Sequence, residues 1–269
     1  MKTTDRGERK LYIRLFSAVC LFFVTMVFCG CGLDVVDTIL EPPLSDGHTA
    51  LYSLDDYTSK YFSFMSFENS PNVSSSVFKF KGTAVYYKIF NNYSTMQSCQ
   101  NAVSSLNTDT NYMSAVELMT ETQKYKTLKL STGSISPLIK AVGANQYVYI
   151  RLTDYGTTAA YKQGICVGNA SMKEYKETAA LTYDGTIVYP RRSINSAYTF
   201  NFGGGNAETD KVPLSTDDDV YWSDTTSVAK TWYVDMYAVS VGLETDTWTY
   251  SYSQVLHLGS VSIVEGGAN

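Results

Sequence analysis

The feature that most limits the possible folds is the C-terminal end of the chain, a series of apolar runs with no long helical pattern. Residues 231–241 (TWYVDMYAVSV) are apolar on both faces, as expected for a strand in the centre of a sheet. A turn at residues 242–247 and two more strands, at 248–252 and 255–264, follow. The chain contains no predicted helix long enough to connect parallel strands, so we expect antiparallel sheets. Together these patterns predict a mainly β protein, an antiparallel β-sandwich.

Strand patterns also fill the earlier part of the chain. Further strands are expected at residues 61–67, 77–90, 125–130, 147–154, 186–189 and 198–202. Gly82 predicts a kink or a β-bulge within its strand. By simple alternation, Val85, Tyr87 and Ile89 form the dry face of that strand. Apolar residues recur at three- and four-residue steps across residues 94–106, which predicts one short amphipathic helix.

The composition suits sheets and argues against one class of partner. The chain has 22 tyrosines against 21 lysines and arginines together, and only 17% of its residues are charged, below the usual quarter. Its net charge is −5, and no basic stripe is present. Nucleic acid, which is bound mainly through its phosphates, is therefore not an expected partner.

The N-terminus has the pattern of an export signal. Basic side chains precede an uncharged run at residues 15–27, and small residues and cysteines follow. The ending at Cys31, which Gly30 precedes, resembles a lipobox, and Cys29 is the weaker alternative. An uncleaved anchor or an ordinary secretory signal would fit the same run, and all three place the remainder outside the cytoplasm.

We therefore expect three parts. They are a lipoprotein signal at residues 1–30, a tether at residues 31–55 and one β-domain at residues 56–265. The lipid on Cys31 would attach the chain to a membrane of the cell envelope, either at the outer membrane and cell surface or at a periplasmic face. Two cysteines remain in the β-domain, Cys99 and Cys166. They form either one disulfide or two buried free thiols, because spacing alone does not show that they meet.

Little in the sequence suggests catalysis. Of the two histidines, His48 lies in the expected tether and His257 lies in the last strand, where a satisfied or exposed side chain is expected rather than a catalytic base. We find no nucleophile elbow, phosphate loop or zinc-binding pattern, and we expect no cofactor. Arg191 and Arg192 could contact an anionic ligand, but a solvated turn is favoured.

Two clusters of side chains are candidates for binding. Asp217, Asp218 and Asp219 offer oxygen ligands that suit calcium, although no known calcium-loop pattern orders them and a solvated loop is favoured. Aromatic residues near strand ends form a candidate binding surface, because exposed aromatic side chains give large contact area at little cost in entropy. Its members are Trp222, Trp232, Trp248 and Tyr250. For most aromatic residues, packing within the sheets is the alternative.

Two resemblances sharpen these expectations. Residues 82–89 (GTAVYYKI) resemble the third strand of a fibronectin type III or immunoglobulin-like domain, and residues 237–259 resemble its last two strands. Such a domain needs about 100 residues, so the resemblance implies one sandwich with long insertions or, alternatively, two modules that share a sheet. The whole chain also resembles the tyrosine-rich lipoproteins of treponemes, which are spirochaetes. The relaxed lipobox, residues 82–92 (GTAVYYKIFNN) and residues 252–261 (YSQVLHLGSV) carry that resemblance.

The resemblance to treponeme lipoproteins implies no particular activity. From the anchor, the sandwich and the missing catalytic groups we expect a non-enzymatic recognition or adhesion module that meets a protein or a glycan. The alternatives are a structural lipoprotein of the periplasm and a lipoprotein that binds calcium or a small ligand.

Overall fold

The computed structural model describes residues 40–50, 52, 56–66, 78–133, 137–141, 146–155, 159–169, 172–224 and 230–266. The predicted signal at residues 1–30, the expected lipidation site Cys31 and the first part of the expected tether lie outside these residues. In the described ranges no helix is long and apolar enough to cross a membrane.

The fold is mainly β, and its largest sheet is built on three long strands. They are β2 (Phe78–Phe90), β12 (Thr231–Glu244) and β13 (Thr249–Val264), in the order β2-β12-β13. β12 is antiparallel to both neighbours and, as its apolar pattern predicts, is buried along nearly all of its length. Short strands complete the edge of the sheet beside β2: β3 (Lys126–Thr127), β5 (Ile139–Lys140) and β11 (Val220–Tyr221). β11 runs parallel to β2, against the expectation of purely antiparallel pairing.

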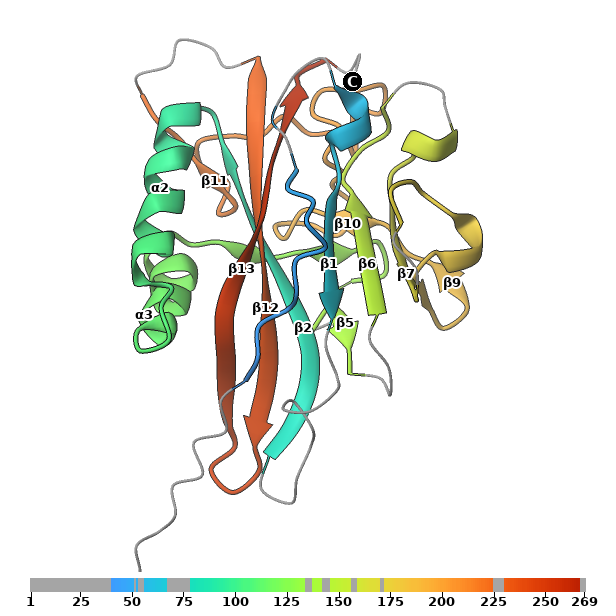
Figure 1. The fold of residues 1–269 in the computed structure, drawn as a ribbon. Coiled ribbons are helices and arrows are strands. Elements are labelled where there is room, and N and C mark those ends of the chain that lie inside the picture. The colour runs from blue at the N-terminus through green and yellow to red at the C-terminus, as the bar shows by residue number, and fades with distance from the viewer. Residues whose placement is uncertain are drawn as a thin grey trace, which may run out of the picture. The chain divides into compact units, whose positions relative to one another are not determined.

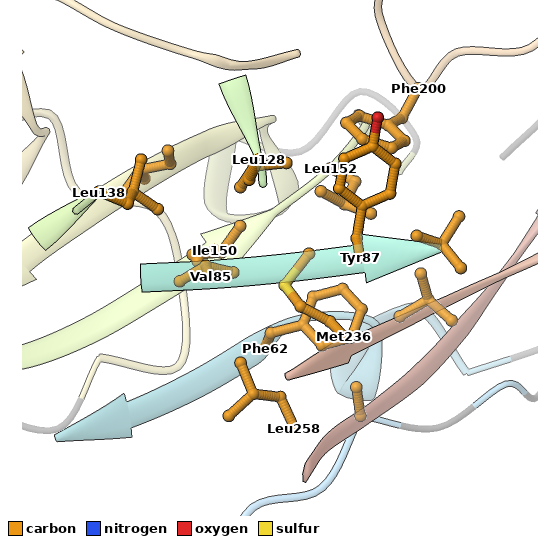
Figure 2. Packing of buried hydrophobic residues seen from close by; sticks show 14 of the residues in the cluster. Phe62, Val85, Tyr87, Leu128, Leu138, Ile150, Leu152, Phe200, Met236 and Leu258 are labelled. Atoms are coloured by element: carbon orange, nitrogen blue, oxygen red, sulfur yellow. The ribbon is translucent and has the colours of Figure 1, made fainter. Parts of the chain in front are cut away.

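A smaller antiparallel sheet packs against one face of the large one. Its strands are β1 (Phe62–Ser66), β6 (Gln146–Arg151) and β7 (Gly164–Gly168), in the order β1-β6-β7. Between the sheets lies the main apolar core, where Phe62 and Ile150 of the small sheet belong to one cluster with Val85 and Met236 of the large sheet (Figure 2). The face of β2 predicted to be dry is therefore confirmed.

Two helices cover the opposite face of the large sheet. α2 (Tyr93–Leu106) and α3 (Tyr112–Glu117) lie on the other side of β12 and β13 from the small sheet (Figure 1). The expected helix is confirmed as α2, and the Asn92 side chain caps it by accepting a hydrogen bond from the Thr95 N–H. A π-helical turn, η2 (Leu118–Thr122), continues α3. The large sheet is thus buried on both faces, whereas in a two-sheet sandwich each sheet has one face buried and the other exposed to solvent.

The rest of the chain forms short elements at the edges of these layers. The strands are β4 (Lys129–Leu130), β8 (Thr182–Tyr183), β9 (Thr186–Ile187) and β10 (Pro190–Arg191), and the 3-10 turns are η1 (Tyr57–Ser59), η3 (Ala159–Tyr161) and η4 (Glu177–Ala179). The strand expected at residues 198–202 is wrong, because this segment is irregular although its aromatic side chains are buried. Burial of Phe200 and Phe202 in the main core explains an apolar pattern without strand pairing.

The described part of the expected tether is not free. Leu44 exchanges backbone hydrogen bonds with Met65, and Ala50 pairs with Gly259 of β13. His48 stacks on Tyr61, with ring centroids 3.8 Å apart. Residues 40–50 are therefore part of the folded domain, and the boundary placed at residue 55 is wrong, because these backbone pairings depend on strands that are distant in sequence.

Candidate functional site

The most exposed aromatic residues of the predicted binding surface lie at the turn between β12 and β13. We call residues 246–250 the aromatic tip; all five side chains are exposed. Trp248 is 76% exposed and Tyr250 is 54% exposed. The hairpin that carries the tip extends past the ends of the small sheet (Figure 1). Both residues thus remain available for contact, as the sequence predicted.

The backbone at Trp248 has an unusual conformation. Its φ is +56°, in the left-handed region that suits glycine, asparagine or aspartate. Apart from Trp248, only Lys124 and Asp184 among the described non-glycine residues have positive φ. For a bulky residue this conformation costs on the order of 1–2 kcal/mol. A glycine would form this turn more easily, so the tryptophan is retained there at a cost in stability.

The other two tryptophans are not part of this surface. Trp232 is 1% exposed and packs in the main core, so its assignment to a binding surface is wrong. Trp222 is half-buried against the same core, with its ring centroid 5.9 Å from that of Trp232. Both stand at the far end of β12 from Trp248, because a strand of this length separates its two ends widely. Both rings therefore serve to pack the core at this end of β12.

The calcium-binding alternative at residues 217–219 is also wrong, because an arginine occupies the carboxylates. Arg192 donates from Nη2 to Asp219 at 2.6 Å and to Asp217 at 2.8 Å, and from Nε to Asp219 at 3.0 Å. Asp219 and Arg192 are fully buried, so neither the solvated loop nor the solvated turn expected here exists. Only Asp218 is exposed. Among the residues that the structure describes, no three side chains of His, Cys, Asp or Glu are grouped to hold a metal ion.

Tyr87 extends this buried ion pair into the large sheet. Its hydroxyl donates to Asp219 at 2.5 Å and accepts from the Ser193 N–H. Burial, and then the Asp219 carboxylate, raise the pKa of Tyr87 well above its usual value, so the hydroxyl keeps its proton. The network ties the irregular segment at residues 192–219 to β2, which is a structural role rather than a binding role.

A second buried carboxylate, Asp235 on β12, lies beneath α2. It accepts hydrogen bonds from Gln100 at 2.7 Å, from Tyr125 at 2.6 Å and from His257 at 2.8 Å. Burial lowers the pKa of His257, but the charge and hydrogen bond of Asp235 outweigh it and leave that pKa raised. Sequence reasoning expected a satisfied or exposed strand histidine at position 257, and His257 is both, because its imidazole contacts Asp235 while 38% of the side chain is exposed. It missed Asp235, whose position in the apolar run of residues 231–241 was the available signal.

A polar groove of about 240 Å³ borders this centre. Gln100, Asn107, Tyr237 and His257 are among its lining residues. Cys99 is a potential nucleophile that interacts electrostatically with Asp235, but burial, and then Asp235, raise the pKa of its thiol. A thiol held protonated at neutral pH is a poor nucleophile. Asp235 can stabilise a proton on His257 and can accept hydrogen bonds. Its contacts also join α2 to β12 and β13.

Many tyrosines surround buried cations. The Arg151 guanidinium is fully buried, donates to the Tyr57 carbonyl at 2.9 Å and to the Tyr149 hydroxyl, and lies 5.2–5.8 Å from several ring centroids. Those rings belong to Tyr61, Tyr149, Tyr155 and Tyr161. Cation–π contacts and packing explain much of the tyrosine content, as the packing alternative predicted.

The two cysteines of the domain are free thiols, so the disulfide alternative is wrong. Cys99 lies on α2 in the apolar cluster beneath the helices. Cys166 lies on β7 in a separate cluster of the small sheet, where its Sγ contacts the backbone of Lys176. Because the large sheet lies between these layers, the two sulfur atoms do not meet.

Comparisons of the chain with protein-family models, with curated proteins and with solved structures found no match.

Proposed function

We propose that this chain is a lipid-anchored protein of the cell envelope that acts as a non-enzymatic recognition module and contacts a protein or a glycan through its aromatic tip. The observation that carries the proposal is Trp248, which is exposed and holds a left-handed backbone conformation at the end of a long hairpin. Exposed tryptophan and tyrosine side chains are typical anchors of recognition surfaces.

The strained turn supports a functional reason for the tryptophan. If the turn served folding alone, glycine or asparagine would satisfy its backbone at lower cost. Another hairpin among the described residues, β8–β9, shows this simpler solution: its positive-φ residues are Asp184 and Gly185. A strained backbone at an exposed aromatic residue therefore supports a binding role for that residue.

The anchor and the remaining chemistry fit the same proposal. Lipid on Cys31 would hold the domain at a membrane surface, either outside the cell or facing the periplasm, where the hairpin could reach a partner. The face-to-face packing of two mainly antiparallel sheets is compatible with a distant relation to fibronectin type III or immunoglobulin-like sandwiches. A non-enzymatic role is favoured because the described thiols, Cys99 and Cys166, are buried and have raised pKa values, which makes both poor nucleophiles.

The decisive experiment separates binding from folding. Trp248→Gly relieves the backbone and removes the side chain, so its stability should remain within about 1 kcal/mol of the wild type. Asp184→Gly makes the matched backbone change at the other hairpin and is the control. Both variants and the wild type are applied to a glycan array and to immobilised host-matrix and envelope proteins.

We expect binding to be lost in Trp248→Gly and kept in Asp184→Gly, and the array that responds identifies the partner class. Full binding by Trp248→Gly would refute the role of the tip. For the anchor, Cys31→Ala should move the protein from the membrane fraction to the soluble fraction. Protease treatment of intact cells then distinguishes the two locations, since a surface protein is digested and a periplasmic one is protected until lysis.

A further inference from the structure

A pocket of about 290 Å³ opens between the small sheet and the short strands near it, away from the residues of the aromatic tip. Its apolar walls include Leu130, Leu138, Val167, Leu181 and Val188. Leu130 and Val188 are fully buried and belong to the main core. Leu138 belongs to the same core and is labelled in Figure 2. The floor of the pocket is therefore the core itself, a surface that favours an apolar ligand.

A glycine fixes one wall of this pocket. Gly82 of β2 has a φ of +128°, and a Cβ at this position would collide with the Ile139 carbonyl oxygen of β5. The close approach allows β5 to pair with Gly82 and Thr83. That pairing holds Ile139 against the core and sets the position of the next residue, Lys140, on the pocket wall. Gly82, where the sequence predicted a kink or a β-bulge, thus builds the pocket edge because it has no side chain.

The pocket lining carries one charge, and it is positive. Lys140 is the one charged residue among the lining residues, and Gln146, Thr182 and Tyr183 supply the other polar side chains. The Lys140 ammonium lies over the Tyr183 ring, 5.6 Å from its centroid. Within the described part of the chain it has no carboxylate within ion-pair distance. An uncompensated cation beside an apolar cavity complements a ligand with an apolar body and an anionic head.

We propose that this pocket binds a small amphipathic carboxylate, with its hydrocarbon body against the core and its head group at Lys140. The pocket volume corresponds to about ten water molecules in the liquid, and hence to a ligand of about ten non-hydrogen atoms. Octanoate has this size and polarity. The site is independent of the aromatic tip, so either proposal can fail without the other.

The test is photo-crosslinking with a diazirine analogue of octanoate on the full-length protein in its membrane, followed by peptide mass spectrometry. Labelling is expected on the peptides that carry Leu138, Leu181 and Val188. Octanoate should compete better than octanol, and octylammonium should compete least, because only the carboxylate complements Lys140. Mapping the label to peptides separates the pocket from general partition into lipid.

Three variants sharpen the result. Lys140→Met should weaken labelling about two- to fivefold, as expected for loss of one charge-assisted contact from an exposed lysine. Thr182→Trp, a change at an exposed residue on the rim, should fill the mouth and abolish labelling. Lys79→Met removes an exposed strand lysine outside the pocket and should have no effect.

Unsaturable labelling, or labelling that Thr182→Trp leaves intact, would overturn the site. Equal competition by octanoate and octanol, with Lys140→Met unchanged, would overturn the assignment of an anionic head group.

Discussion

The buried ion pair between Arg192 and Asp219 gives the sharpest test of how this fold is held together. Arg192→Met keeps most of the side-chain volume but removes the guanidinium. Asp219 would then stay fully buried with the Tyr87 hydroxyl as its remaining side-chain partner. A buried carboxylate that loses its ion-pair partner is costly, because its desolvation is then offset only by the charge of Lys88, which interacts with Asp219 but forms no ion pair with it.

The expected loss in the free energy of unfolding is about 3–5 kcal/mol for Arg192→Met. In a domain of this size that corresponds to a fall in Tm of about 10 °C. Adding Asp219→Asn removes the orphaned charge and leaves an acceptor for Tyr87. The double variant should therefore be more stable than Arg192→Met alone by about 2 kcal/mol.

Urea unfolding followed by tryptophan fluorescence measures these differences, since Trp232 is buried in the main core. Lys162→Met is the control, because Lys162 and Asp154 form an exposed ion pair at 3.0 Å that should contribute less than about 1 kcal/mol. If Arg192→Met cost no more than Lys162→Met, or if the double variant lost as much as the two single variants together, the reasoning would be refuted.

Three further predictions concern His257, two glycines and the two cysteines. The pKa of His257 is raised in the folded state, so its contribution to stability is fully present below the ordinary pKa of 6.5 and is lost as pH rises through the raised pKa. The stability gap between the wild type and His257→Gln in urea titrations should therefore shrink as pH rises above 6.5, and a constant gap would contradict the assignment. Gly259→Ala should cost about 3 kcal/mol, because its Cβ would lie 2.5 Å from the Ala50 carbonyl oxygen at a φ of +94°, whereas Gly185→Ala, with open space around it, should cost about 1 kcal/mol in the same assay. Cys99 and Cys166 should resist alkylation until the protein unfolds, since both are buried and burial raises the pKa of both thiols; a cross-linked Cys99–Cys166 peptide in mass spectra would show the opposite.

Local patterns predicted the main elements well. The apolar alternation of residues 77–90 and 255–264 and the helical spacing of residues 94–106 each correspond to an element of the structure. These signals are reliable because each depends on side chains within one segment and on which face they bury. The strand at residues 164–168 was missed, since five residues with two glycines carry too little periodicity.

The sites were harder to predict than the elements. Trp222 and Trp248 look alike in sequence, yet one packs on the core and the other is exposed at a turn. The aspartates at positions 217–219 look like a solvated loop until Arg192 is placed beside them. The alternation of apolar and polar residues predicted neither outcome. It indicates on which face of a strand a side chain lies, but not which part of the chain covers that face.

By itself, the sequence determined that this chain forms mainly antiparallel β structure with one amphipathic helix, since backbone geometry converts a local period of two or 3.6 into a buried face. Only the tertiary structure decided which charges are buried, which aromatic residues remain exposed and where the apolar pocket lies. The physical reason is that burial and ion pairing are set by partners such as Arg192 and Asp219, or β5 and Gly82, which are far apart in the chain and meet only when the layers pack.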